Sequence, residues 1–416
     1  MEYGGINYWG LIITLFCYLQ TTFLLGQDRP LCSTYEYLQN QKKLNPYLIE
    51  VELANEEKIQ RWIKQKSSSR LTNTVITIPV VVHVVYNKAE QNISDAQIRS
   101  QIEALNNDYR RLNADTGLTP EIFRPLAADT RIQFQLAQQD PAGNPTFGIT
   151  RKFTVKDTFT SIDSVKFKAS GGTDIWNNEH YLNIWVCNLS KGLLGYSQSP
   201  GVGLAKTDGL VINYRYFGTI GTVNSPFNLG RTTTHEVGHW LNLIHIWGDS
   251  KCGNDFVADT PIQADASSRC KPFPYPSCNN YSDMFMNYMD YSYDACMNLF
   301  TIGQRDRMLA TLNTLRVRLL SSPGAQPLNL TASDERIFEL YPNPTSGFLY
   351  LKSFFPAVSF HLKVIDSVGR IRLVRDIENL APQTLNVDLS SLANGMYIVQ
   401  IKTPELTFAK RIILDH

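Results

Sequence analysis

The stretch that decides the fold is "HEVGHWLNLIH", His235–His245, which holds three of the chain's seven histidines. His235 and His239 are four residues apart, so on a helix their side chains project from one face, one turn apart. Two imidazoles in this arrangement can bind one zinc ion. His245 follows six residues later, and about 600° of helical rotation would leave it about 120° away from the ligand face. His245 can therefore be the third ligand only if the helix ends before it.

Asn242 is the residue at which we expect that helix to end. After Gly, Asn is the residue most at ease in the left-handed conformation that terminates helices. Glu236 would then face the open side of the site. It would take a proton from a zinc-bound water, because zinc lowers the pKa of that water to roughly 7. Glu236 would pass this proton to the leaving amine. A bare HExxH also occurs by chance in unrelated chains, where such histidines are surface or packing residues, but here three ligands and a base agree with one geometry.

The composition of the whole chain is that of a globular protein. The chain has 416 residues, of which 43% are hydrophobic and 19% charged, with a net charge of +1. This length is enough for two or three domains, and the charge balance favours neither a nucleic-acid partner nor an anionic membrane partner. The apolar run Tyr8–Leu25, followed by Gly26, predicts a signal peptide over residues 1–26. It lacks a positive N-terminal region, so a retained membrane anchor is the alternative.

The cysteines agree with export. Four of the six that remain after the leader lie between Cys252 and Cys296, which suggests two disulfides in a loop-rich region of a protein from an oxidising compartment. A second zinc site is less favoured, because the chain has no CxxC pair. Cys187 falls in a strand-type run and is expected to be a buried, unreactive core residue.

The chain divides into successive segments by composition. Residues 27–73 are polar, contain the helix-type run "NPYLIEVELANEEKIQRWIKQ" and end in "KSSSR", which is typical of a cleavable propeptide. Residues 74–320 begin with the strand-type run "VITIPVVVHVVYN", followed by an amphipathic helix that Ser94 would cap, with Gln97 completing a capping box. Further strands and the histidine helix follow, which indicates a sheet packed with helices. Residues 321–334 read as a linker, and residues 335–416 as a small β-sandwich domain.

The histidine motif, taken with a methionine downstream, resembles the metzincin metallopeptidases. Their signature is HExxHxxGxxH followed by a Met-turn; here Asn242 stands at the Gly position, and "NYMDYS" places Met289 in the turn. Within the metzincins, "HEVGHWL", "VADTP", "NYMDYS" and "FTIGQRDRM" resemble the pappalysin family over Val75 to about Leu320. The resemblance implies an α+β, metzincin-like zincin domain with a twisted sheet, an active-site helix and a loop-rich C-terminal subdomain. It also implies that Met289 forms a hydrophobic floor under the zinc and that Tyr291 helps to stabilise the tetrahedral intermediate.

The same resemblance implies further roles for the cysteines and acidic residues. Cys32, in "RPLCST", would act as a cysteine switch whose thiolate binds the zinc and keeps the zymogen inactive; an unpaired or oxidised thiol is the alternative. The segment "CGNDFVADTP" would hold a structural calcium ion, because calcium prefers carboxylate and carbonyl oxygens as ligands. The implied disulfides are Cys252–Cys278 and Cys270–Cys296, and the implied calcium ligands are Asp255, Asp259 and Thr260.

The C-terminal segment has its own motifs. "YPNPTSGFLYL", "VIDSVGR", "VDLSSLANGMYIVQI" and "KRIIL" resemble the sorting domain of the type IX secretion system. The resemblance implies that the secretion machinery is a partner, and that the protein meets a membrane only during export or surface attachment. It predicts a secreted or cell-surface protein.

The sequence as a whole predicts a secreted zinc endopeptidase that is made as a latent zymogen and acts on proteins or peptides. One alternative is an inactive surface binding protein or adhesin on a metzincin scaffold. Glu236 argues against it, because a binding domain has no need of a base there. Another alternative is a zincin whose third ligand is a downstream glutamate instead of His245.

Overall fold

The computed structural model describes residues 1, 31–66, 74–190, 192–326, 338–353, 358–380, 384–403 and 407–416. The predicted leader after Met1, the "SSSR" end of the predicted propeptide and most of the predicted linker lie outside these residues. None of the helices in the described part of the chain is long and apolar enough to cross a membrane.

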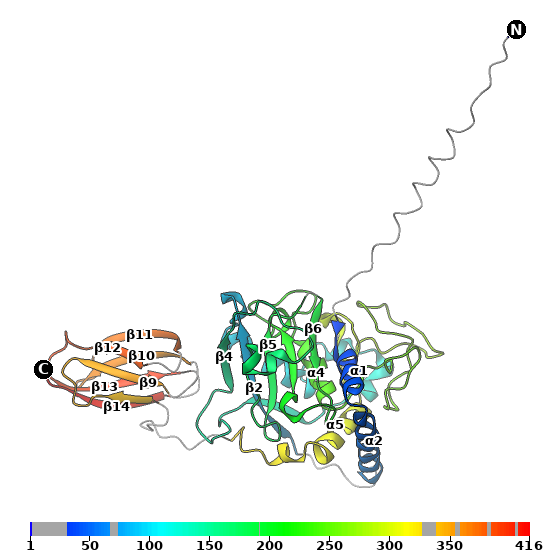
Figure 1. Ribbon diagram of the computed structural model, residues 1–416, viewed down its shortest axis with the longest axis horizontal. Coiled ribbons are helices and arrows are strands. Elements are labelled where there is room, and N and C mark those ends of the chain that lie inside the picture. The colour runs from blue at the N-terminus through cyan, green and yellow to red at the C-terminus, as the bar shows by residue number, and fades with distance from the viewer. Residues whose placement is uncertain are drawn as a thin grey trace. The chain divides into compact units, whose positions relative to one another are not determined.

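A seven-stranded mixed sheet has six of its strands in residues 74–326, which we call the sheet domain (Figure 1). Its strand order is β1-β6-β7-β5-β2-β3, with β4 also paired to β2. All neighbouring strands are parallel except β6 and β7. The central strand β2 is buried along most of its length, as expected for a strand covered on both faces. The strands are β1 (Leu31–Cys32), β2 (Ile76–Tyr86), β3 (Ile132–Leu136), β4 (Ile149–Phe153), β5 (Leu182–Cys187), β6 (Leu193–Ser197) and β7 (Leu210–Asn213).

Two helices, α3 (Asp95–Tyr109) and α4 (Arg231–Trp240), pack with this sheet around one hydrophobic core. Ser94 caps α3 as predicted, since its hydroxyl accepts from the Gln97 backbone N–H at 3.2 Å. The predicted capping box is only half formed. The Gln97 side chain instead donates to the carbonyl of Phe217 at 2.8 Å and so ties α3 to the loop after β7.

A loop-rich region separates α4 from α5 (Ile302–Thr314). Two disulfides close it, Cys252–Cys278 and Cys270–Cys296, which is the pairing that the resemblance implied. Cys32 and Cys187 are free and buried. The short 3-10 helices of the chain are η1 (Ala89–Gln91), η2 (Thr116–Leu118), η3 (Glu121–Leu126), η4 (Ser164–Lys166), η5 (Lys168–Ser170), η6 (Ala205–Thr207), η7 (Tyr214–Tyr216), η8 (Asp294–Cys296) and η9 (Val317–Ser321).

The predicted propeptide forms α1 (Thr34–Leu44) and α2 (Tyr47–Lys66), both docked on the sheet domain. Its short strand β1 extends the sheet beyond β6. On α2, Glu56 makes a bidentate ion pair with Arg307 of α5, with N–O distances of 2.9 and 2.5 Å. The carbonyl of Gly324, four residues beyond the predicted domain end at residue 320, accepts from the Gln138 N–H at 2.8 Å.

The C-terminal segment folds into two antiparallel sheets that share a core, as predicted for a β-sandwich. One sheet has the order β11-β10-β13-β14 and the other β12-β9-β8. Inward-facing residues alternate with exposed ones along β9 and β13, which is the pattern of a sheet with one buried face. The strands are β8 (Phe338–Tyr341), β9 (Phe348–Ser353), β10 (Val358–Asp366), β11 (Ile371–Leu380), β12 (Thr384–Asp388), β13 (Gly395–Lys402) and β14 (Thr407–Leu414).

Candidate metal centre

The helix α4 ends where the sequence predicts. Its last residue is Trp240, and Asn242 adopts φ +69°, in the left-handed region. The N–H of Leu243 then returns to the carbonyl of Gly238 at 2.9 Å, which closes the helix end. The predicted bend at Asn242 is confirmed, and it turns His245 back towards the face of α4 that carries the other two histidines.

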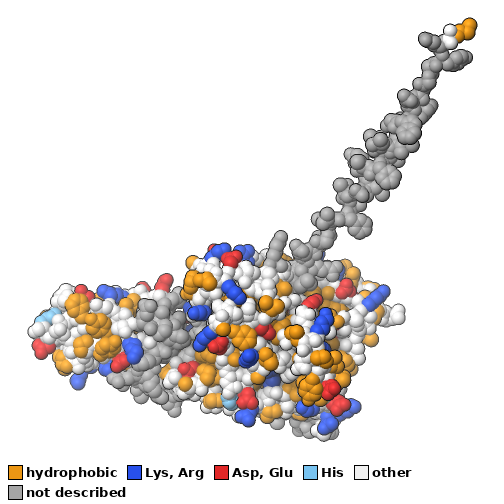
Figure 2. All heavy atoms as spheres, in the orientation of Figure 1, with side chains coloured by type: hydrophobic (Ala, Val, Ile, Leu, Met, Phe, Trp, Pro, Cys, Tyr) orange, Lys and Arg blue, Asp and Glu red, His pale blue; other side chains and the backbone are white. Residues whose placement is uncertain are grey.

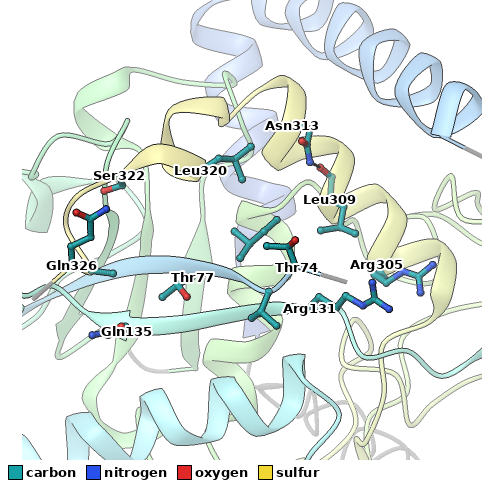
Figure 3. A pocket seen from close by; sticks show the side chains of 13 residues that line it. Thr74, Thr77, Arg131, Gln135, Arg305, Leu309, Asn313, Leu320, Ser322 and Gln326 are labelled. Atoms are coloured by element: carbon teal, nitrogen blue, oxygen red, sulfur yellow. Dashed lines mark hydrogen bonds between the residues drawn. The ribbon is translucent and has the colours of Figure 1, made fainter. Parts of the chain in front are cut away.

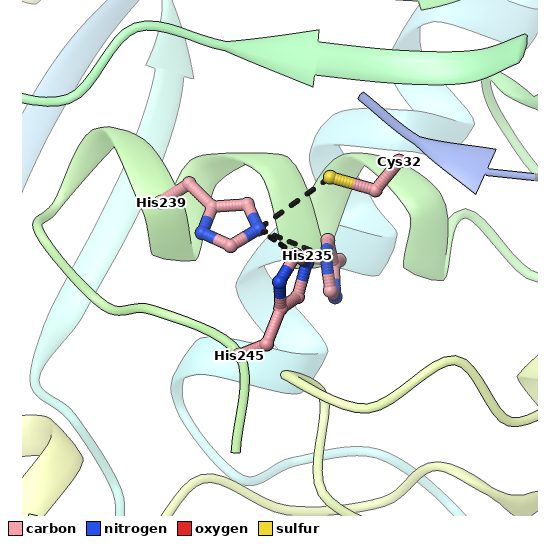
Figure 4. Close-up of side chains that lie close together, drawn as sticks. All are labelled: Cys32, His235, His239 and His245. Carbon is pink, nitrogen blue, oxygen red and sulfur yellow. Dashed lines mark hydrogen bonds between the residues drawn. The ribbon is translucent and has the colours of Figure 1, made fainter. Parts of the chain in front are cut away.

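Three imidazole nitrogens converge beside α4 (Figure 4). The Nε2 atom of His239 lies 3.0 Å from that of His235 and 3.1 Å from that of His245. The Sγ atom of Cys32 lies 3.5 Å from the same His239 nitrogen. Within the described part of the chain, these four residues form the cluster of His, Cys, Asp and Glu side chains able to hold a metal ion, with ligand atoms within 4.8 Å of one another.

The opposite ring nitrogens orient the histidines. His235 Nδ1 lies 2.7 Å from the carbonyl of Tyr288, and His239 Nδ1 lies 2.8 Å from that of Leu243. His245 Nδ1 bonds the carboxylate of Asp249. Since a carbonyl oxygen only accepts, the rings of His235 and His239 carry their proton on Nδ1 and direct Nε2 lone pairs at one point. Lone pairs this close need a cation between them, and three imidazoles suit zinc.

The burial of the cluster favours the neutral form of its histidines, which is the form that binds a metal ion. Burial, with the nearby His245, lowers the pKa of His235 to about 3, and it lowers that of His239 well below its usual value. Burial and the Glu236 charge raise the pKa of the Cys32 thiol well above its usual value. A thiolate at this place therefore needs a cation beside it, which a metal ion would supply.

Glu236 lies beside the histidines and is 1% exposed. Burial raises its pKa to about 7, although the neighbouring Cys32 and Thr34 side chains act in the other direction. Its Oε2 atom accepts from the Thr34 hydroxyl at 2.8 Å, and its Oε1 atom has no hydrogen-bond partner among the described residues. One carboxylate oxygen is thus held by the N-terminal segment, and the other is available for a proton.

Met289 packs against α4, and the Tyr291 ring lies beside the rings of His235 and His245. Met289 is fully buried under α4, and a Cβ built on Gly238 would lie 2.4 Å from its sulfur, so only glycine allows this approach. The Tyr291 hydroxyl donates to the backbone carbonyl of Cys32 at 3.2 Å. Tyr291 therefore already binds a peptide carbonyl at the edge of the site.

The residues implied as calcium ligands are engaged in hydrogen bonds. Asp255 accepts from the Thr260 hydroxyl at 2.7 Å. Asp259 accepts from the Thr301 hydroxyl at 2.7 Å and from the N–H of Gly303 at 2.9 Å, so it caps α5. Calcium at these residues stays a prediction.

Two functional contacts were missed from the sequence. Asp249, which orients His245, lies four residues after it, so the spacing alone offered a signal. Thr34, which occupies Glu236, lies two residues after Cys32, but it is 202 residues away from Glu236 and nothing local marks it. Asp294, in the short helix η8, is also buried and accepts from the N–H of Leu229 at 2.7 Å.

Figure 2 shows basic and acidic side chains interspersed over the visible face. A cavity of about 560 Å³ opens between the start of β2 and α5, lined by residues that include Arg131 and Arg305 (Figure 3). None of its lining residues belongs to the histidine cluster, so it is a separate feature of the sheet domain.

Comparisons with known proteins match both halves of the chain. Residues 169–313 match the family described as pregnancy-associated plasma protein-A, and residues 339–415 match the secretion system C-terminal sorting domain. An extracellular metalloprotease of Arthroderma benhamiae is 32% identical over 250 residues, which cover 58% of this chain and 79% of that protein.

Two solved structures from Tannerella forsythia are similar over the sheet domain. Mature mirolysin in complex with a cleaved peptide is 50% identical, with a TM-score of 0.60, and the match covers 62% of this chain and 100% of that chain. A promirolysin mutant is 46% identical, with a TM-score of 0.64, and the match covers 71% of this chain and 98% of that chain.

Proposed function

The chain belongs to the pappalysin family of zinc metalloendopeptidases, and from that premise we propose that His235, His239 and His245 hold one catalytic zinc ion, with Glu236 as general base. The observation that carries this proposal is the convergence of three Nε2 atoms, with those of His235 and His245 lying 3.0 and 3.1 Å from that of His239. The extracellular relatives and the sorting domain make the protein secreted or attached to the cell surface.

Zinc bound at these residues would lower the pKa of water towards neutrality and polarise the scissile carbonyl. Glu236 takes a proton from the attacking water and gives it to the leaving amine nitrogen. Its Oε1 atom, which has no hydrogen-bond partner among the described residues, supports this role because it can accept the proton. Met289, packed on Gly238, keeps the floor of the site apolar and holds α4 in place.

Tyr291 stabilises the carbonyl oxygen of the scissile bond as it gains negative charge. Its hydroxyl now donates to the carbonyl of Cys32, and a substrate carbonyl in the same place would accept the same hydrogen bond. A donor fixed before the reaction stabilises this charge without having to reorganise.

We also propose that residues 27–73 are a propeptide that keeps the enzyme latent through three contacts. Cys32 takes the metal position that water would use, the Thr34 hydroxyl occupies Glu236, and the Cys32 carbonyl occupies Tyr291. The promirolysin match supports this division, since it covers a larger share of this chain than the mature mirolysin match does. The remaining segments would be the leader (1–26), the protease domain (74–320), a linker (321–334) and the type IX sorting domain (335–416), whose machinery is the expected partner.

The test separates metal binding from proton transfer. After an added protease has removed the propeptide, Glu236→Ala should retain zinc but lose cleavage of a protein substrate by about 10²-fold or more. His245→Ala should lose zinc, measured by mass spectrometry after dialysis. His361→Ala, an exposed histidine of the β-sandwich, is the control and should change neither. Cleavage that persists in Glu236→Ala, or in enzyme stripped of metal, would contradict the proposal.

A further inference from the structure

The side chain of Tyr37 fills a pocket of the sheet domain near Glu236. Tyr37 lies on α1, three residues after Thr34, whose hydroxyl donates to Glu236. Three residues of helix advance the chain by about 4.5 Å. Although Tyr37 belongs to the propeptide, it is only 1% exposed, so the sheet domain encloses it almost completely.

Four sheet-domain residues form the walls of this pocket, which we call the Tyr37 pocket: Asp163, Lys166, Tyr196 and Gln198. The Tyr37 hydroxyl donates to Asp163 Oδ2 at 2.7 Å and lies 3.1 Å from Gln198 Oε1. The Tyr196 ring lies 5.3 Å from the Tyr37 ring, centroid to centroid. The Lys166 ammonium lies 5.5 Å from the centroid of the Tyr37 ring, in a cation–π contact.

The residues that form the pocket walls also contact one another and neighbouring sheet-domain residues, independently of Tyr37. Asp163 Oδ1 accepts from the Lys166 ammonium at 2.8 Å and lies 3.2 Å from the Tyr196 hydroxyl, which donates to it. Lys166 also donates to the carbonyl of Thr207 at 2.7 Å, and the Thr207 hydroxyl donates to Gln198 Oε1 at 2.7 Å. We expect the pocket to keep its shape when the propeptide leaves, because these contacts lie within the sheet domain.

Tyr37 supplies the hydrogen-bond donor for one carboxylate oxygen of the pocket, Asp163 Oδ2. In the described part of the chain, the hydrogen bond to that oxygen comes from the Tyr37 hydroxyl. Loss of the propeptide leaves a carboxylate oxygen, a cation and an aromatic face around an opening of phenol size. A ligand that fills the opening without a donor would bury this carboxylate oxygen unpaired, so a ligand that restores the hydrogen bond is favoured.

The pocket lies on the path that a peptide takes along the edge of the sheet. The propeptide runs beside β6, where the Ser33 N–H donates to the carbonyl of Gly195 at 3.0 Å and the Ser197 N–H donates to Thr34 Oγ1 at 2.8 Å. Gln198, a wall of the pocket, follows directly after Ser197. A substrate bound along β6 would therefore have a side chain within reach of the Tyr37 pocket. That side chain would lie a few substrate residues away from the residue beside Glu236.

We propose that in the mature enzyme the Tyr37 pocket binds a tyrosine side chain of the substrate close to the scissile bond. This inference rests on the proposed proteolytic function and names a substrate class for it. Phenylalanine fits the ring but gives Asp163 no donor. A charged side chain would lose its hydration on entering a pocket whose own two charges already pair with each other. A phenol satisfies the ring contact, the cation and the acceptor together.

The test uses zinc-loaded enzyme obtained from the full chain after the propeptide has been removed. Fluorogenic peptides of one parent sequence carry Tyr, Phe or Leu at each of the four positions on either side of the scissile bond. At one position we expect kcat/KM for Tyr to exceed that for Phe by about 10- to 100-fold, as for loss of a hydrogen bond to a charged acceptor. Equal values for Tyr and Phe at every position would overturn the pocket but leave the proteolytic function standing. Failure to cleave any peptide would overturn both.

A variant links this preference to the pocket. The double change Asp163→Asn with Lys166→Met removes both charges together, because a buried lysine left alone would risk the fold. We expect the Tyr-to-Phe ratio at the preferred position to fall to about one tenth of its original value or less. Asp174→Asn, an exposed acid paired with Lys168, is the matched control and should leave the ratio unchanged. A ratio that survives the double change would overturn the assignment.

Discussion

The hydroxyl of Thr34 joins the predicted catalytic base to the edge of the sheet. It donates to Glu236 Oε2 at 2.8 Å and accepts from the N–H of Ser197 at 2.8 Å. Both partners are buried, so neither can turn to water while the propeptide is docked. A single side chain would therefore contribute two hydrogen bonds to the proposed latency, in addition to the thiol of Cys32.

Replacing that hydroxyl should weaken latency. Thr34→Val keeps the shape of the side chain but leaves a carboxylate oxygen and a backbone N–H without partners, which costs about 1.5–3 kcal/mol of propeptide docking. We expect the full-length Thr34→Val chain to lose its propeptide about 10-fold faster than the native chain, followed by gel electrophoresis at fixed concentration. Thr34→Ser retains the hydroxyl and serves as the control. Equal rates for Val and Ser would show that the hydroxyl plays no part in latency.

The end of α4 shows how an element is terminated to build a site. His245 follows His239 by six positions, and the left-handed conformation of Asn242 between them lets both reach one point. Arg307 of α5 braces this turn, because its Nε donates to the carbonyl of Asn242 at 2.8 Å. The ligand geometry therefore depends on backbone conformation at one position as much as on the histidines.

Substitution at Asn242 should separate backbone strain from loss of a side chain. Asn242→Gly should keep the bend and retain zinc, because glycine adopts positive φ without a steric penalty. Asn242→Val should destabilise the fold by about 1–2 kcal/mol or more and weaken zinc binding, because a β-branched residue resists this conformation. Urea unfolding and competition with a chelator measure the two effects. Zinc binding of equal strength in both variants would mean that the bend is not needed.

The sequence predicts those parts of the site that are local. The spacing of His235 and His239 and the turn at Asn242 follow from the geometry of a single helix and its end. The contacts that join distant elements have no such period. Glu56 and Arg307 pair over 251 residues, and nothing beside either of them indicates the partner. Gln97 illustrates the same limit, since its capping role was plausible locally but its amide found a better partner after β7.

A buried ion pair lies beside the C-terminal end of α4. Asp208, just before β7, accepts from both terminal nitrogens of Arg316, at 2.7 and 2.8 Å, and from the indole N–H of Trp240 at 2.9 Å. Burial alone would raise the pKa of Asp208, but the charge and hydrogen bonds of Arg316 more than offset it and lower the pKa below its ordinary value of 3.8. The ionised form of Asp208 is therefore favoured by folding.

This depressed pKa gives a stability that depends on pH. The contribution of Asp208 is complete above pH 3.8 and is lost as the pH falls through its lower folded-state pKa. Asp208→Asn should reduce the free energy of unfolding by about 3–5 kcal/mol at neutral pH, because it leaves Arg316 buried without its charge partner. In urea unfolding with chelator present, this difference should shrink below pH 3.8. Asp157→Asn, from an exposed pair, should change stability by less than about 1 kcal/mol. A difference that grows on acidification would contradict the assignment.

At the scale of the whole molecule, the disulfides and the candidate metal ligands are unevenly distributed along the chain. Both disulfides and the histidine cluster lie in the sheet domain, whereas residues 338–416 contain no cysteine. The β-sandwich has a buried core of its own, with fully buried residues such as Leu349, Leu362 and Phe408. Its stability should therefore not depend on redox state or metal.

Calorimetry of the full-length chain should show this independence as two unfolding transitions. Zinc at about 1,000 times its Kd stabilises a fold by about 4 kcal/mol, which corresponds to a Tm shift on the order of 10 °C for a domain of this size. Chelator with a reductant should therefore lower one transition by at least that amount and leave the sandwich transition in place. A chain ending at Gln326 should lack the insensitive transition. If instead a single transition moves as a whole, the two cores unfold together, and the sorting domain is coupled to the metal centre.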